Sequence, residues 1–94
     1  MYNIEISSDA VRAFRGLEKA IQLKIQEKID WLAENANTVT HYQLSFLPDK
    51  LKGLCRLKAG DYRILYFIYH AGKRVSIYLV EHRSVVYKIL KDIT

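Results

Sequence analysis

The chain has 94 residues, of which 50% are hydrophobic and 27% charged, a balance typical of one folded domain and not of a disordered chain. No apolar run reaches the roughly 20 residues of a membrane-spanning helix, and the first residues lack the basic start and apolar stretch of a secretory signal. We therefore expect one domain over residues 1–94, located in the cytoplasm, with the lone Cys55 as a small buried residue.

The net charge of +5 is distributed unevenly along the sequence. Residues 1–49 contain 5 Lys and Arg against 7 Asp and Glu, whereas residues 50–91 contain 10 Lys and Arg against only Asp61 and Glu81. A solvated basic surface is the ordinary explanation for excess lysine. A one-sided excess interleaved with tyrosines instead favours a polyanionic partner, either a nucleic acid or an acidic protein.

The chain begins with a short strand and a short helix. Residues 2–6 alternate apolar and polar side chains, which predicts a half-exposed strand. Residues 9–17 predict a helix, because Ala10, Phe14 and Leu17 share one side of it. Three polar residues precede the helix, and any one of them can cap its free N–H groups: Ser7, Ser8 and Asp9.

Residues 18–35 predict a longer helix with one apolar stripe. The stripe consists of Ile21, Ile25, Ile29, Leu32 and Ala36. Trp31 flanks the stripe, and we expect it to help close the core. Because the two helices are adjacent in sequence, we expect them to form a hairpin that packs on one face of a sheet.

Residues 38–52 follow no single period and contain the only proline, so we expect a loop. His41, within this loop, is expected to be a loop or surface residue. Because His41, His70 and His82 are widely separated in the sequence, we expect no metal site.

The rest of the chain predicts three strands, at residues 54–58, 62–69 and 74–81, joined by tight turns, and then a short helix at 84–90. The middle strand is strongly apolar and therefore central. The resulting order is β-α-α-β-β-β followed by a short C-terminal helix. We expect an α+β fold, an antiparallel sheet of about four strands with the N-terminal helix hairpin on one side.

Strict alternation along each strand assigns the polar side chains to faces. Arg56 and Lys58 share one face of the first strand. Arg63 lies on one face of the central strand, where burial is costly unless its guanidinium reaches water, Asp61 or Glu81, or a ligand anion. In the third strand, alternation groups His82 with Ser76, Tyr78 and Val80.

The third strand ends in His82 and Arg83, with Tyr87 one helical turn further on. Cleaving RNA without a metal requires proton transfers and neutralisation of the phosphorane charge. Histidine suits the proton transfers, arginine suits the phosphorane, and tyrosine can stack on a base or donate a hydrogen bond. The alternative interpretation is a polar strand end with a tyrosine packed on the sheet.

The segment Leu51–Lys88 closely resembles the RelE/ParE superfamily of type II toxins. The resemblance rests on two motifs, G-x-x-R-L-x-x-G-D-Y-R from Gly53 to Arg63 and H-R-x-x-V-Y from His82 to Tyr87. The preceding strand and helix pair match the order of elements in that superfamily, so the likeness covers nearly the whole chain.

The resemblance implies a metal-independent mRNA interferase that needs no cofactor and cuts the codon in the ribosomal A site, leaving a 2′,3′-cyclic phosphate and a 5′-hydroxyl. It implies that Arg56 and Arg63 stabilise the phosphorane, Arg83 binds the phosphate, Tyr87 orients the 2′-hydroxyl or stacks on a base, and His82 transfers a proton. Four lysines are expected to bind RNA or the ribosome: Lys50, Lys52, Lys58 and Lys88.

One departure from the superfamily concerns the proton acceptor. Some RelE toxins carry two lysines flanking one residue on the first strand of this segment, where the present chain has Leu54-Cys55-Arg56. The acceptor therefore stays open among His82, Lys52 and, less favoured, Glu81.

Two rival functions are also open. ParE-type members poison DNA gyrase without the nuclease residues, and a degenerate toxin would act only with its antitoxin in repression. Arg63, His82, Arg83 and Tyr87 favour the RelE type. A RelE-type toxin implies a cognate antitoxin, the ribosome and mRNA as partners, with operator DNA contacted only through the antitoxin complex and no membrane.

Overall fold

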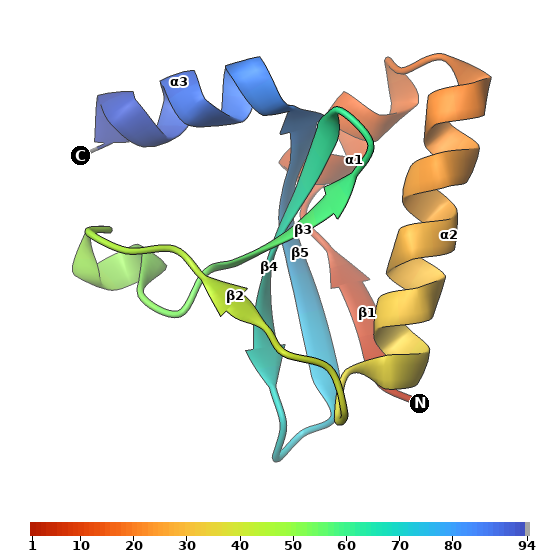
Figure 1. The fold of residues 1–94 in the computed structure, drawn as a ribbon, viewed down its shortest axis with the longest axis vertical. Coiled ribbons are helices and arrows are strands. Elements are labelled where there is room, and N and C mark those ends of the chain that lie inside the picture. The colour runs from red at the N-terminus through yellow and green to blue at the C-terminus, as the bar shows by residue number, and fades with distance from the viewer. Residues whose placement is uncertain (94) are drawn as a thin grey trace.

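The computed structural model describes residues 1–93, so residue 94 of the expected domain lies outside the described part (Figure 1). Its elements are β1 (Asn3–Ile6), α1 (Ser8–Arg15), α2 (Lys19–Asn35), β2 (Tyr42–Gln43), a 3₁₀ turn η1 (Asp49–Leu51), β3 (Cys55–Ala59), β4 (Tyr62–Tyr69), β5 (Arg74–His82) and α3 (Arg83–Ile93). This order confirms the predicted α+β class. Within residues 1–93, no helix has the length and apolar character needed to cross a membrane.

The sheet has five strands in the order β1-β5-β4-β3-β2. The four strands from β2 to β5 are antiparallel to their neighbours, as expected, but β1 pairs with β5 in parallel, from Asn3↔Arg74 to Ile6↔Ile77. The expected antiparallel sheet of about four strands is thus observed with one additional short strand, and only the parallel pairing of β1 departs from the prediction. The parallel pairing is possible because the α1–α2 pair forms a long crossover after β1. The fifth strand was missed because the two residues of β2 are too few to show an alternating pattern.

Helices α1 and α2 pack on one side of the sheet, called here the helix-covered face. The predicted stripe of α2 is confirmed, because Ile25, Ile29, Leu32 and Ala36 are buried and Ile21 packs against them. Trp31 does not help to close this core: its side chain is 41% exposed, and Lys28 Nζ lies 5.5 Å from the centre of its ring. Trp31 follows Lys28 by three positions, which places both on the solvent flank of the helix.

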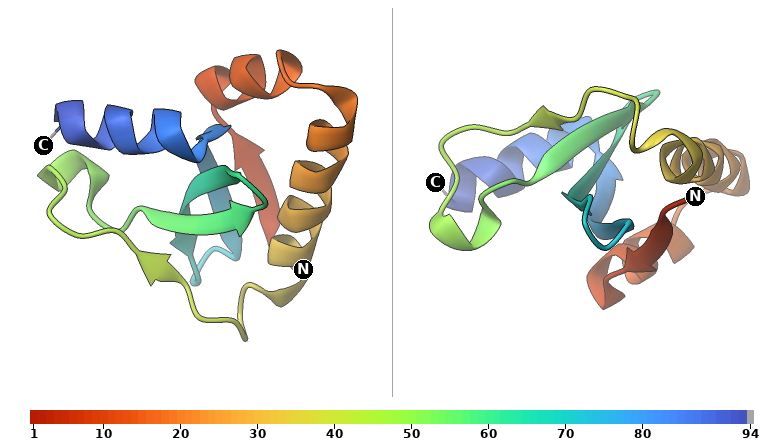
Figure 2. Two further views of the ribbon diagram at one scale, coloured as in Figure 1. Left: turned by 45° about the horizontal axis from the view of Figure 1, so that its top comes forward. Right: turned by 90° about the horizontal axis from the view of Figure 1, so that it is seen from below.

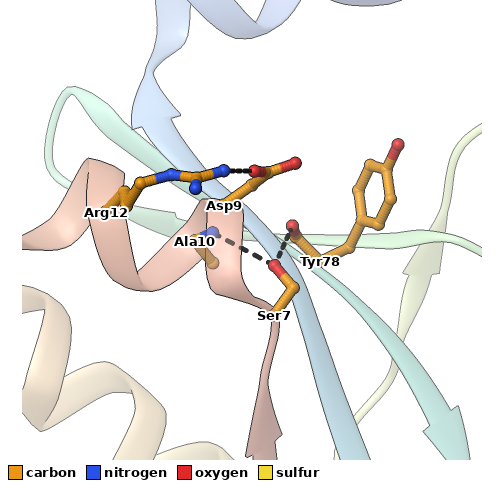
Figure 3. Close-up of polar contacts among 5 residues, drawn as sticks. All are labelled: Ser7, Asp9, Ala10, Arg12 and Tyr78. Atoms are coloured by element: carbon orange, nitrogen blue, oxygen red, sulfur yellow. Dashed lines mark hydrogen bonds and ion pairs between the residues drawn. The ribbon is translucent and has the colours of Figure 1, made fainter.

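The start of α1 is fixed by Ser7, one of the three predicted caps (Figure 3). Its Oγ accepts a hydrogen bond from Ala10 N at 3.1 Å and donates one to the carbonyl oxygen of Tyr78 at 2.8 Å. Arg12 and Asp9 form an ion pair on the exposed side of the same turn. Ser7 thus joins the beginning of α1 to the middle of β5.

Tyr78 is the extra residue of a β-bulge. Leu65 pairs with Leu79, but the next residue, Tyr66, pairs with Ile77, so Tyr78 has no partner. The bulge puts Ile77 and Val80 in the same core. The strict alternation predicted for β5 is therefore wrong: Val80 and His82 lie on the helix-covered face, whereas Ser76, opposite Phe67, lies on the other.

Helix α3 lies on the opposite side of the sheet from α2, so that the strands stand between them (Figures 1 and 2). It packs through Val86 against Leu54 and Leu65, with Leu90 beside them. We call this side the α3 face. The backbone N–H of Arg83 donates to the carbonyl of Asp61 at 2.8 Å, which fastens the first turn of α3 to the β3–β4 turn.

The segment between α2 and β3 is a loop for most of its length, as predicted, and His41 is a half-buried residue of this loop. Its Nε2 lies 2.7 Å from the carbonyl of Ala36, an acceptor only, so Nε2 carries the proton and Nδ1 accepts from the Tyr66 hydroxyl at 2.6 Å. Burial raises the pKa of Tyr66, and the neighbouring Cys55 adds to the effect. The rings of His41 and His70 lie 5.6 Å apart despite their separation in the sequence.

Candidate functional site

Strands β3 and β4 place three of the predicted basic residues on the α3 face. Arg56 lies opposite Leu65, and Lys58 lies opposite Arg63. Leu65 belongs to the small core under α3. Because paired residues and residues two positions apart share a face, Arg56, Lys58 and Arg63 point to the same side as Leu65. Arg56 is half-buried and Lys58 is exposed. The predicted shared face of Arg56 and Lys58 is thus observed.

Arg63 is buried, with only 6% of its surface exposed. Its Nη1 donates to the carbonyl oxygens of Gly60 and Tyr62, each at 2.9 Å, and its buried Nε has no hydrogen-bond partner. Glu81 lies opposite Arg63 in the register, yet Arg63 forms no ion pair with a carboxylate among residues 1–93. A buried cation without a counter-charge is costly, and a bound anion would lower that cost.

The first turns of α3 bring two further predicted residues to this face. Arg83 begins the helix and is exposed, and Tyr87 follows one turn later with 51% of its surface exposed. Val86, between them, contacts the core residue Leu65, which lies opposite Arg56. Arg56, Arg63, Arg83 and Tyr87 therefore belong to the three elements that meet at this small core, the junction of β3, β4 and α3. Lys88 is exposed on α3 next to Tyr87.

The structure does not bring His82 into this group. The His82 ring lies edge-on to Tyr62 with the ring centres 5.4 Å apart, on the helix-covered face. Its Nδ1 accepts a hydrogen bond from the backbone N–H of Ser84 at 3.2 Å and lies 2.9 Å from the Ser84 hydroxyl. These contacts resemble those of a helix cap at the start of α3.

Glu81 is the carboxylate that the fold places on the α3 face next to Arg63. In the sequence Glu81 was less favoured than His82, which stands where the resemblance implies a proton-transfer residue. Strict alternation, without the bulge, also groups Glu81 with Val75 and Ile77, which lie on the helix-covered face. No residue type in β5 indicates a bulge at Tyr78, so the sequence contains no clear signal that Glu81 and His82 lie on the opposite faces from those predicted.

Lys50 and Lys52 lie in and just after η1, at the far end of the loop that packs on the α3 face through Leu44 and Leu47. Both lysines are exposed, and Lys52 Nζ lies 3.6 Å from Asp49 Oδ1. They stand apart from the junction of β3, β4 and α3, at positions where they can contact a large partner.

A family model described as "ParE toxin of type II toxin-antitoxin system, parDE" matches residues 4–87. The chain belongs to the RelE/ParE superfamily of type II toxins. The resemblance stated from the two motifs is thus confirmed, and the chain is a toxin of a type II toxin–antitoxin system.

Solved structures of RelE toxins share the fold of this toxin. The RelBE2 toxin–antitoxin complex of Mycobacterium tuberculosis matches with 26% identity and a TM-score of 0.72, over 88% of this chain and 92% of that one. The archaeal RelE–RelB complex of Pyrococcus horikoshii OT3 matches with 24% identity and a TM-score of 0.67, over 87% and 94%. The isolated E. coli RelE toxin matches with 18% identity and a TM-score of 0.68, over the full length of both chains. A sequence comparison with curated proteins gives no significant match.

Proposed function

We propose that this toxin is a metal-independent endoribonuclease that enters the ribosomal A site in the cytoplasm and cleaves the mRNA there. The main support is the position of Arg56, Arg63 and Arg83 on the three elements of one junction, together with the absence of any ion pair between these arginines and a carboxylate in residues 1–93. Guanidinium groups match phosphate oxygens and stay charged, so such a group can neutralise a phosphorane.

The exposed residues of the group are assigned the direct contacts. Arg83 and Arg56 would bind the scissile phosphate, and Tyr87 would orient the 2′-hydroxyl or stack on a base. Arg63 has its Nη1 committed to two carbonyl oxygens of the β3–β4 turn. Arg63 would therefore hold this turn in place and add positive potential beneath the phosphate.

We assign the proton acceptor to Glu81 in preference to His82. Glu81 lies on the α3 face opposite Arg63, whereas His82 lies on the helix-covered face with Nδ1 occupied at the start of α3. Lys52 is exposed, is ion-paired with Asp49 and stands apart from the junction. A carboxylate beside an arginine can accept the proton of a 2′-hydroxyl within hydrogen-bond reach.

The partners follow from the same assignment. RelE toxins are found in complexes with their antitoxins in the M. tuberculosis and P. horikoshii structures, and we propose that a cognate antitoxin covers the α3 face of this toxin. Operator DNA would be contacted only through that complex. The exposed lysines would hold ribosomal RNA or mRNA backbone, namely Lys50, Lys52, Lys58 and Lys88.

The description of the matching family model, a ParE toxin, supports a second candidate. On that alternative the protein binds and poisons DNA gyrase. It predicts inhibited supercoiling with intact mRNA.

Cleavage of a labelled mRNA by the toxin on programmed ribosomes tests the assignment. Glu81→Gln should lower the cleavage rate by about 10²–10⁴-fold, the range for loss of a general base. His82→Asn should cleave at nearly the wild-type rate, because asparagine is also a good helix cap. A large loss in His82→Asn with an active Glu81→Gln would reverse the two roles, and no cleavage by the wild type would contradict the nuclease proposal.

A further inference from the structure

The exposed side of α2 carries its charges on two different flanks. Asp30 and Glu34 line a shallow pocket with β1. Lys28 lines another with β3, and Lys24 lies beside the β3–β4 turn, close to Gly60. Because residues of a helix advance by about 100° each, Lys24 and Lys28 stand one above the other on the β3 side. The side of α2 that carries Lys24 and Lys28 therefore faces β3, which carries Arg56 and Lys58.

The pocket shared by α2 and β3 extends around the edge of the sheet. It is lined by Lys28 from α2, Tyr42 from β2, and three consecutive residues of β3: Arg56, Leu57 and Lys58. Leu57 packs in the core of the helix-covered face, whereas Arg56 and Lys58 lie on the α3 face. Since β2 pairs only with Cys55 and Arg56, the edge of β3 beyond Arg56 is open.

In the described part of the chain, the cations around this edge are not ion-paired, although Asp61 lines the same pocket as Lys24. Lys24, Lys28, Arg56 and Lys58 form no ion pair within residues 1–93. Two aromatic side chains accompany the cations: Tyr42 is 65% exposed, and Trp31 lies exposed beside Lys28. Unneutralised cations with exposed aromatic rings are the features with which proteins bind single-stranded nucleic acid, through the phosphate backbone and by base stacking.

We propose that this edge is a second RNA-binding surface, the α2–β3 surface, formed by Lys24, Lys28, Trp31, Tyr42, Arg56 and Lys58. A single strand that leaves the junction of β3, β4 and α3 passes around the open edge of β3. It then lies along α2, with its phosphates on the lysines and bases stacked on Trp31 and Tyr42. The choice of RNA as the ligand rests on the proposed function, whereas the surface itself rests on its own residues.

Trp31 is the only tryptophan of the chain, so its fluorescence reports directly on this surface. Titration with an oligouridine of about ten nucleotides, within the usual site size of a single-strand binder, should quench Trp31 emission. Lys24→Ala/Lys28→Ala should weaken this binding on the order of tenfold at low salt and reduce the slope of log K against log salt by about 1.4, or 0.7 for each lost phosphate contact. A matched control, Arg15→Ala/Lys19→Ala, removes the same charge from exposed positions that do not line the surface, and it should preserve the slope.

The titration is carried out without ribosomes, so it separates the two proposals. Quenching in the wild type and in Arg15→Ala/Lys19→Ala, with the slope change confined to Lys24→Ala/Lys28→Ala, supports the surface even if mRNA cleavage is never observed. Unchanged Trp31 emission at saturating oligouridine, or equal slopes in the two double variants, contradicts it. Quenching by polyglutamate and not by oligouridine also contradicts it and points to an acidic protein partner.

Discussion

The two faces of the sheet differ in what they bury and in what they leave unpaired. Among residues 1–93, the core of the helix-covered face contains thirteen buried residues, whereas the core under α3 contains three. The α3 face instead carries Arg56, Lys58 and Arg63 without carboxylate partners. Stability is thus concentrated on one face, which leaves the other able to carry uncompensated charge for a ligand.

This contrast predicts that substitutions on the two faces reduce activity for different reasons. On the helix-covered face, loss of activity should follow loss of folding. On the α3 face, activity should be lost while the free energy of unfolding stays nearly constant. Arg63 is an exception, because its side chain is buried and bonded to the β3–β4 turn, so its removal should affect both quantities.

The largest effect is expected in the core of the helix-covered face. Leu32 is fully buried between α2 and the sheet, and Leu32→Ala should lower the free energy of unfolding by about 2–5 kcal/mol. Urea unfolding monitored by circular dichroism measures this change. The fraction of the variant that remains folded should keep wild-type activity per molecule. A loss of activity in the folded protein would contradict the assignment of stability to one face and activity to the other.

The next effect concerns the exposed arginine of the α3 face. Arg83→Ala should lower the rate of ribosome-dependent cleavage by about 10²–10³-fold, as for removal of one charged stabiliser of a transition state, and leave the melting temperature nearly unchanged. Arg15→Ala, at an exposed position at the end of α1, is the matched control and should cleave normally. Equal losses in both variants would indicate a general charge effect and not a site.

A smaller effect is expected for Tyr87, which is half-exposed one turn after Arg83. Tyr87→Phe keeps the ring for stacking and removes only the hydroxyl, so cleavage should fall about tenfold, the equivalent of one hydrogen bond. Single-turnover cleavage on programmed ribosomes measures the rate. A loss as large as that of Arg83→Ala would assign the hydroxyl a direct part in proton transfer.

The smallest effect is a loss of stability at alkaline pH that arises on the helix-covered face. Burial raises the pKa of the Cys55 thiol above its ordinary value of 9.0 and also raises the pKa of Tyr66. From about pH 9 upward, the unfolded chain releases these protons while the folded chain retains them. The free energy of unfolding should then fall, by at most about 1.4 kcal/mol per pH unit for each proton.

Urea unfolding between pH 7 and about 10 measures this dependence. Cys55→Ala should show a shallower decline than the wild type once the pH exceeds the ordinary range of a thiol. An unchanged decline in that variant would show that other groups cause it.

The sequence alone predicts those features that depend on local periodicity. The stripe of α2 and the bounds of β4 are observed as expected, because repeated apolar spacings and turn residues determine them. The pairing partner of β1 was not predictable in the same way, since four residues carry no information about which strand they will join. The two residues of β2 likewise acquire their strand conformation only from pairing with β3.

One extra residue in β5, Tyr78, made the predicted faces of the site residues in that strand wrong. Arg56, Arg63, Arg83 and Tyr87 were proposed from their types and motifs, and they lie on the three elements that meet at the junction of β3, β4 and α3. The bulge at Tyr78 moves His82 to the helix-covered face, and a register shift of this kind reverses every face assignment beyond it. The sequence raised the cost of burying Arg63 but did not predict its partners, because they depend on the return of its guanidinium to the carbonyl oxygens of the β3–β4 turn.

The central claim is that the α3 face cleaves mRNA on the ribosome. Its most direct test is to induce the toxin alone in cells and map mRNA 5′ ends on translated and untranslated messages, with Arg83→Ala as the inactive control. We predict new ends within codons on translated messages only, and none with the variant. Growth arrest with intact mRNA and inhibited supercoiling would contradict the claim and favour the gyrase poison, and no arrest at all would indicate a degenerate toxin.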